Sequence, residues 1–410
     1  LFCVIYWNRD GITPYLGSYT KGKGIGMRKL IGVLVFGLIA CGAVFQYSLE
    51  AEEFSDSQGY IDVHMHLDGY YRDQNSGPRQ GMQRPRRGYP QGGPMSRRQQ
   101  PSFLEDFDTA AARLIQKMDM MGVQTTIVMP PPQESKKPNA ADYRKLSEII
   151  AKYPDRLALG AGGSTLSPMI LSTAPSDVTS DTKLLFRMTA EDLVQAGAKV
   201  FGEMTAMHFS MNEHHSFSMA APDHPLFLLL ADIAAENDMP IDLHMEAIPE
   251  EMDMPERLAD LPNNPDRVPG TLEPFERLLE HNRNARIVWQ HIGWDNTGFM
   301  TPELLRGLLQ KHSNLYLAMR VAGPGRPDRP ELITNRLLDS NGFLKEGWKQ
   351  LMIDFADRCT IGSDEFVGIP GVSNPKPISF EDTWEMLDQL PDDAARKIGR
   401  ETASRVYKIN

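Results

Sequence analysis

The stretch YIDVHMHLDG, residues 60–69, combines an apolar strand pattern with two histidines and an acidic residue at a regular spacing. His64, His66 and Asp68 are two residues apart, and residues i and i+2 of a strand point to the same side. The residues around them are apolar, as in a strand that is covered on both faces. The stretch therefore predicts a buried strand that presents two imidazoles together near its end.

Seven further apolar segments follow, and segments with helical spacing separate them. The strand-like segments lie at 124–131, 156–163, 198–204, 239–247, 285–293, 314–320 and 359–366. The helical ones lie at 107–122, 141–154, 189–197, 225–238, 272–282, 302–312, 331–357, 379–390 and 392–407. This alternation predicts an α/β fold, a (β/α)8 TIM-like barrel. An open doubly wound sheet is the alternative, and it is disfavoured because no glycine-rich dinucleotide motif follows the first strand.

Polar side chains recur at the C-terminal ends of the predicted strands, where TIM barrels carry their functional residues. Besides His64 and His66, these residues are Glu203, His244, His291, Arg320 and Asp364. In a closed barrel the eighth strand lies beside the first, so we expect Asp364 next to the histidine pair and His244 on the opposite wall. Imidazoles and carboxylates in this number suit Zn²⁺ or another divalent ion such as Mn²⁺.

The distribution of histidines supports this prediction, because four of the 10 histidines fall at the ends of predicted strands. A single buried histidine would more often be a core residue. His208, His214 and His215 lie in the segment after 198–204, where we expect a solvated loop, with contact to a substrate as the alternative.

Some polar residues are expected at helix ends instead of in a site. Thr189 is expected at the N-cap of the helix at 189–197, with acidic residues in the first turn. His281 and His312 lie near helix C-termini, where an imidazolium suits the helix dipole. These residues need no functional explanation.

Composition narrows the classes of function for this chain of 410 residues. Its formal net charge of -11 excludes general nucleic-acid binding, which requires a basic surface. Cys3, Cys41 and Cys359 are scattered and cannot form a disulfide framework. A metal site would therefore use histidines and carboxylates.

The N-terminal part carries an export pattern. Met27 is followed by two basic residues and by an apolar run at 30–45, which is typical of a secretory signal and shorter than a membrane span. We therefore expect 1–26 to be a non-native upstream segment and 27–41 a signal peptide. The residues LIAC, ending at Cys41, resemble the lipobox of bacterial lipoproteins, which implies lipidation of that thiol. A plain cleaved signal and an uncleaved anchor are the alternatives.

Each alternative predicts an exported protein of the periplasm or cell envelope, and membrane contact is expected only where an N-terminal anchor is retained. We expect a tether at 42–57 and the barrel at 58–408. Residues 70–101 hold seven arginines and one acidic residue among many Gln, Gly and Pro residues, which predicts a flexible, solvated insertion. A basic lid, or a contact with an anionic envelope polymer, is the alternative.

The order of these motifs resembles the amidohydrolase superfamily, in its amidohydrolase-related branch (amidohydrolase family 2). The matching features are H-x-H on the first strand, His on the fifth and sixth, and Asp on the eighth. The contexts IDVHMHLDG, WQHIGW, IGSDEF and AARKIGRETASRVY are similar too, and the resemblance covers about 59–408. The arginine-rich insertion departs from the family pattern.

The resemblance implies roles for these residues. His64, His66 and His244 would bind metal, and Asp364 would bind metal and accept the proton of the attacking water. His291 would bind a second ion or polarise a carbonyl. Glu203 could bridge two ions, or contact substrate instead. Lys199 is a poor bridge, because four residues of strand place it about 13 Å away.

The expected function is metal-dependent hydrolysis of an ester, lactone or amide bond in a small molecule, with one or two ions. A divalent-metal-dependent decarboxylase of aromatic or unsaturated carboxylic acids is the alternative, in which Arg320 would hold the substrate carboxylate. His208 is the other candidate for substrate binding. A non-catalytic metal-binding envelope lipoprotein is the second alternative, and a homo-oligomer is compatible with all three.

Overall fold

The computed structural model describes residues 4–8, 11–15, 59–68, 103–130, 143–211, 213, 216–321, 333–368 and 380–409. The chain divides into two units, Leu1–Ala51 and Glu52–Asn410. In the first unit, β1 (Val4–Asn8) pairs antiparallel with β2 (Gly11–Tyr15). The expected signal at 27–41, the tether at 42–57 and the insertion at 70–101 lie outside the described residues and stay predictions. Within the described ranges, no helix combines the length and apolar character that a membrane span requires.

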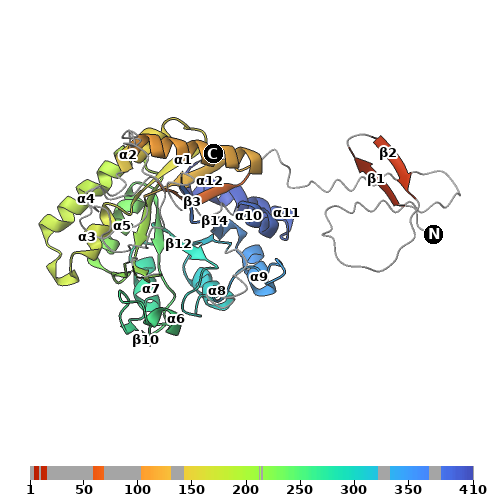
Figure 1. Cartoon of the computed structure of the whole chain (residues 1–410). Helices are drawn as coiled ribbons and strands as arrows, with labels where there is room; N and C mark the ends of the chain where they lie inside the picture. Colours follow the sequence, from red (N-terminus) through yellow and green to blue (C-terminus); the bar gives the residue numbers. More distant parts are fainter. Residues whose placement is uncertain are drawn as a thin grey trace, which may run out of the picture. The chain divides into compact units, whose positions relative to one another are not determined.

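The described part of the second unit is built around a closed barrel of eight parallel strands (Figure 1). In barrel order they are β3 (Ile61–Asp68), β4 (Thr125–Val128), β5 (Leu157–Gly162), β6 (Val200–Thr205), β9 (Pro240–His244), β12 (Arg286–Ile292), β13 (Leu315–Met319) and β14 (Cys359–Ile361). The pairing of Ile361 with Asp62 closes the ring. Beyond β14, β15 (Glu365–Gly368) also runs along β3. The predicted (β/α)8 barrel is confirmed, and the closure excludes an open doubly wound sheet.

Helices cover the outside of the barrel (Figure 1). They are α1 (Phe103–Met121), α2 (Tyr143–Ile150), α3 (Leu166–Leu171), α4 (Ser180–Gln195), α5 (Pro225–Glu236), α6 (Glu256–Ala259), α7 (Leu272–His281), α8 (Pro302–Lys311), α9 (Glu346–Asp354), α10 (Phe380–Leu387), α11 (Asp392–Arg396) and α12 (Thr402–Tyr407). Their apolar faces follow the helical period; α7, for example, buries Leu272, Phe275, Leu278 and Leu279. Strands β4, β5 and β6 are buried along their whole length because the helices cover them.

Two predicted helices differ from the structure. Helix α4 begins at Ser180, and its N-cap is Thr179, whose side chain accepts a hydrogen bond from the backbone N–H of Thr182. The prediction of a cap at Thr189 is therefore wrong. The hydroxyl of Thr189 lies inside the helix and donates to the carbonyl of Leu185 at 2.9 Å. The capping box at Thr179 starts the helix earlier in the sequence. Thr189 is tolerated inside the helix because its hydroxyl bonds to the backbone carbonyl of Leu185.

The long helix predicted at 331–357 is wrong for its first part. Among the described residues of this range, 333–345 form turns, bends and isolated bridges, Glu346–Asp354 is an α-helix, and a short 3-10 helix follows at Ala356–Arg358. Asp295 causes part of this difference, because its carboxylate accepts hydrogen bonds from the side chains of Thr334 (2.9 Å) and Asn335 (2.6 Å). These contacts tie the segment after β13 to the loop after β12.

Candidate metal centre

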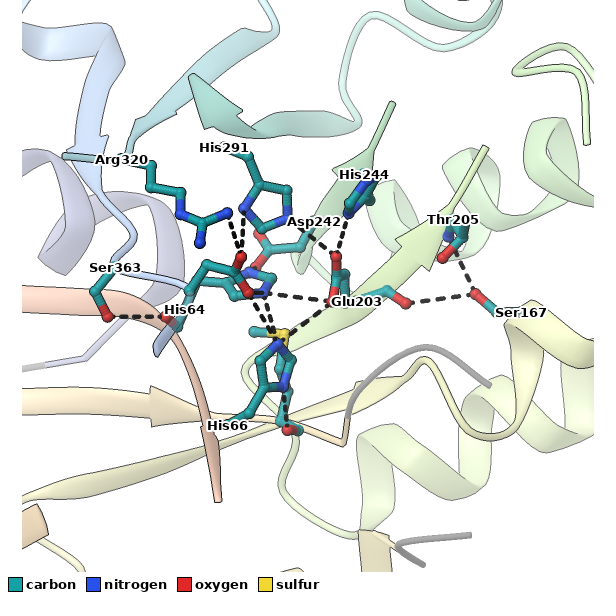
Figure 2. Close-up of polar contacts among 12 residues, drawn as sticks. His64, His66, Ser167, Glu203, Thr205, Asp242, His244, His291, Arg320 and Ser363 are labelled. Carbon is teal, nitrogen blue, oxygen red and sulfur yellow. Dashed lines mark hydrogen bonds and ion pairs between the residues drawn. The ribbon is translucent and has the colours of Figure 1, made fainter. Parts of the chain in front are cut away.

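Four histidines and two carboxylates meet at the C-terminal ends of the barrel strands (Figure 2). His64 and His66 leave β3 on the same side, and their Nε2 atoms lie 3.2 Å apart. The other ring nitrogen of His66, Nδ1, lies 2.9 Å from the carbonyl oxygen of Met129 and is held by it. The structure therefore brings the two imidazoles of the H-x-H motif together with one nitrogen of each directed at a common point.

Glu203 lies between the four histidines of the centre, and each of its carboxylate oxygens faces two of them. Its Oε1 is 2.6 Å from Nδ1 of His244 and 3.0 Å from Nε2 of His291. Its Oε2 is 3.5 Å from Nε2 of His64 and 3.4 Å from Nε2 of His66. A carboxylate with one oxygen toward each pair of imidazoles has the arrangement that a bridging ligand requires.

Asp364 faces the same imidazoles from the segment between β14 and β15. Its Oδ1 lies 3.4 Å from Nε2 of His66 and 3.8 Å from Nε2 of His64. Its Oδ2 lies 2.5 Å from a guanidinium nitrogen of Arg320 and 3.7 Å from Nδ1 of His291. The expected neighbourhood of Asp364 and the histidine pair is therefore present, with one carboxylate oxygen anchored and the other directed into the centre.

The donor atoms fit one or two divalent ions. In this centre, two sets of three residues have their ligand atoms within 4.8 Å of one another. The first set is His64, Glu203 and His291, and the second is His64, His66 and Asp364. Imidazole nitrogens and carboxylate oxygens are ligands that Zn²⁺ and Mn²⁺ accept. Within the described residues, Nδ1 of His291 is buried without a hydrogen-bond partner, as a ligand or donor awaiting its partner would be. His244, a predicted ligand, lies outside both groups, with its Nδ1 against Glu203.

Electrostatics in the centre depend on burial and on close opposite charges. Burial alone would lower the pKa of His64, but Glu203, Asp242 and Asp364 outweigh it and raise the pKa to about 10. Burial would raise the pKa of both Glu203 and Asp364, but nearby positive charges outweigh it. The charge of His64 holds the pKa of Glu203 well below its usual range, and that of Arg320 does the same for Asp364. Both carboxylates are thus ionised, and a bound cation would replace the proton on His64.

His291 behaves differently, because burial lowers its pKa to about 4. A neutral imidazole has a lone pair on one nitrogen and a proton on the other, so His291 can act as a ligand or as a hydrogen-bond donor. Its backbone and that of Asp364 have positive φ angles of 64° and 51°. Residues other than glycine rarely adopt this conformation, which is concentrated at functional sites.

The remaining predicted residues fall at distinct places. Arg320 lies at the centre, but its guanidinium is engaged by Asp364 and stacks 4.0 Å above the ring of Trp294. The ring of His208 packs 4.6 Å from that of His244, at the edge of the centre. Lys199 is exposed, consistent with its rejection as a bridge. His214 and His215 lie outside the described residues.

Sequence reasoning missed Asp242, which is fully buried on β9. Its Oδ2 lies 3.6 Å from Nδ1 of His64. Asp242 precedes His244 by two residues, so strand periodicity could have placed both on the inner face. Another cluster, made by Glu276, Glu280 and His312, is outside the barrel, and Lys311 already pairs with both of its carboxylates.

No protein-family model and no curated protein matches the chain. Among solved structures, a probable 2-pyrone-4,6-dicarboxylic acid hydrolase from Acinetobacter baumannii is 14% identical, covering 86% of this chain and 100% of that chain with a TM-score of 0.45. An organophosphorus hydrolase from Deinococcus radiodurans is 14% identical, with 86% and 93% covered and a TM-score of 0.46. Amidohydrolase 2 from Bifidobacterium longum subsp. infantis is 12% identical, with 86% and 100% covered and a TM-score of 0.40. At these values, the geometry of the centre itself has to support any statement about activity.

Proposed function

We propose that the chain is a metal-dependent hydrolase of amidohydrolase type, which adds water across an ester, lactone or amide bond of a small molecule. The observation that carries this proposal is the convergence of His64, His66, Glu203, His291 and Asp364 at the mouth of the barrel. Buried carboxylates and imidazoles at such separations are costly to assemble unless they bind a cation or perform chemistry.

The residues present would hold one ion between His64, His66 and Asp364, or two ions bridged by Glu203. When bound, a divalent ion acts as a Lewis acid that activates water and polarises a carbonyl oxygen. The chain supplies the proton acceptor: Asp364 is ionised, and Arg320 orients it through Oδ2 so that Oδ1 faces the imidazoles. After accepting the proton, Asp364 would return it to the leaving group.

The role of His291 follows from its neutral state. If Nε2 carries the proton and donates to Glu203, Nδ1 offers a lone pair on the side of Asp364. With the other tautomer, Nε2 becomes a metal ligand and Nδ1–H faces Asp364. The number of metal ions bound per chain decides whether His291 is a metal ligand or a group that polarises the substrate carbonyl.

Decarboxylation requires a cation that is available to the substrate carboxylate. Arg320 was the candidate for this role, but it is paired with Asp364 and stacked on Trp294. The geometry therefore favours hydrolysis. Release of CO2 from aromatic or unsaturated acids would support the decarboxylase instead, and bound metal without turnover on any substrate class would support a binding protein.

The test is metal content followed by a substrate panel. Residues 50–410 are purified and dialysed, and tightly bound metal per chain is measured by elemental analysis. Two equivalents would assign Glu203 as a bridge, and one equivalent would assign His291 to catalysis. No binding after addition of Zn²⁺ or Mn²⁺ would contradict the proposal. Hydrolysis of a set of esters, lactones and amides, with CO2 release measured in parallel, identifies the reaction.

Export is a separate part of the proposal, supported by the basic and apolar pattern of 27–41. Expression of the full chain in a bacterium, with Cys41→Ser as the comparison, tests it. We expect the unaltered protein in the membrane fraction and the Cys41→Ser protein without lipid. Equal distribution of the two in the cytoplasm would contradict export.

A further inference from the structure

A buried polar chain lies behind the metal centre and reaches the last helix. The phenol hydroxyl of Tyr407, on α12, donates a hydrogen bond to Oδ1 of Asp242 at 2.7 Å. Oδ2 of the same carboxylate lies 3.6 Å from Nδ1 of His64. His64 and Asp242 are 0% exposed and Tyr407 is 1% exposed, so solvent cannot substitute for any of these contacts.

The side chain of Gln290 also interacts with the Asp242 carboxylate, but the two atoms that face each other make no hydrogen bond to any described residue. Within the part of the chain that the structure describes, Nδ1 of His64 and Oδ2 of Asp242 are both buried without a hydrogen bond. Leaving a buried polar atom unpaired destabilises the folded state. An approach of roughly half an ångström would convert their 3.6 Å separation into a hydrogen bond and satisfy both.

The contact also crosses the barrel. Asp242 is on β9 and His64 is on β3, and four strand steps separate these strands in either direction around the ring. Helix α12 contacts β3, and Tyr407 belongs to one apolar cluster with Ile61 of β3 and Val288 of β12. Since Tyr407 engages Oδ1, the carboxylate is held with Oδ2 toward His64.

We propose that Asp242, oriented by Tyr407, is a positioning residue that holds His64 with Nδ1–H directed at Asp242 and the lone pair of Nε2 directed at the metal centre. Histidines that bind metal commonly donate their second ring N–H to a carboxylate, which fixes the tautomer and makes the ligating nitrogen more basic. This inference rests on the proposed metal-dependent function and adds a role for the C-terminal helix.

The test compares Asp242→Asn and Tyr407→Phe with Tyr316→Phe as a matched control. Tyr316 belongs to the same apolar cluster as Tyr407, but its hydroxyl accepts a hydrogen bond from Arg405 at 3.4 Å instead of facing Asp242. Co²⁺ is the probe metal, because its visible absorption reports the ligand geometry. The measurements are Co²⁺ affinity, the Co²⁺ spectrum, and circular dichroism and thermal unfolding of the metal-free proteins.

We expect Asp242→Asn and Tyr407→Phe to bind Co²⁺ at least about tenfold more weakly than the unaltered protein, with altered spectra. Tyr316→Phe should match the unaltered protein in both readouts. A purely structural role would lower the unfolding temperature without changing the spectrum. If Asp242→Asn does not fold, Tyr407→Phe decides, because it removes one oxygen atom and keeps the ring.

Two outcomes separate the inference from the proposed function. Unchanged affinity and spectrum in the folded variants, with Co²⁺ bound by the unaltered protein, would overturn the positioning role and leave the hydrolase proposal intact. Failure of the unaltered protein to bind Co²⁺, Zn²⁺ or Mn²⁺ would overturn both.

Discussion

Oδ2 of Asp364 lies 2.5 Å from a guanidinium nitrogen of Arg320 in a close ion pair. The second oxygen faces the imidazoles of β3. The pair therefore fixes the orientation of the group that we propose as proton acceptor. It also engages Arg320, the candidate for holding the substrate carboxylate of a decarboxylase.

Replacing the proton acceptor should abolish turnover without unfolding the protein. We expect Asp364→Asn to lower kcat by about 10²–10⁴-fold, the usual contribution of a positioned acid or base. Asp357→Asn is the control, because Asp357 is exposed in the short 3-10 helix that precedes β14. Hydrolysis rates and circular dichroism are measured for both, and full activity in Asp364→Asn would refute the assignment.

Removing the orienting cation should affect catalysis in two steps. Arg320→Lys keeps a positive charge near Asp364 but loses the planar stack on Trp294, so we expect a loss of kcat of about tenfold. Arg320→Met also removes the charge and should lose more. Equal activity of the three proteins in steady-state assays would show that the ion pair does not orient the proton acceptor.

Loss of a ligand should remove metal. We expect His64→Ala to contain less than about a tenth of the metal of the unaltered protein, since breaking up a ligand set costs at least this factor in affinity. His281→Ala is the control, because His281 is on the barrel exterior, 3.1 Å from Asp232. Elemental analysis after dialysis measures both, and full metal occupancy in His64→Ala would exclude it as a ligand.

The stability of the fold should depend on pH through His224. Its Nδ1 accepts a hydrogen bond from the N–H of Leu226 at the start of α5, and Nε2 donates to the carbonyl of Thr173. Burial lowers the pKa of His224 below its usual 6.5. As the pH falls below about 6.5, the unfolded chain binds a proton that the folded protein resists, so the free energy of unfolding decreases.

His224→Asn keeps an N-cap acceptor without a titrating ring. We expect its free energy of unfolding to decrease less than that of the unaltered protein between about pH 8 and about pH 5. Urea unfolding at both pH values measures this difference. Parallel decreases in the two proteins would show that His224 does not contribute to acid destabilisation.

The corrected start of α4 makes a further prediction. Thr179→Ala should lower the free energy of unfolding by about 1 kcal/mol, because the helix loses its N-cap acceptor. Thr189→Ala should change it by less than about 0.5 kcal/mol, since Thr189 lies inside the helix and alanine has the higher helix propensity. Urea unfolding of the two variants is the measurement, and the reverse order would restore Thr189 as the cap.

Errors in the sequence analysis arose where a local pattern competes with its surroundings. The TAED motif at Thr189 has the composition of a helix start, but the chain is already helical from Ser180. The apolar spacing in 331–357 predicts a helix, yet Asp295 holds Thr334 and Asn335 in a loop. In both cases, hydrogen bonds made by other residues outweigh helix propensities, which amount to only a few tenths of a kcal/mol per residue, roughly.

By itself, the sequence determined the barrel and the polar residues at its mouth. Apolar strands that alternate with amphipathic helices can bury their surfaces only in such layers, and the i, i+2 spacing directs His64 and His66 to one side for reasons of strand geometry. The tertiary structure decided which groups meet: Glu203 between four imidazoles, Arg320 against Asp364, and Asp242 with Tyr407 behind His64. These contacts join different strands and the last helix, so they depend on the register and closure of the whole barrel, and no local pattern carries that information.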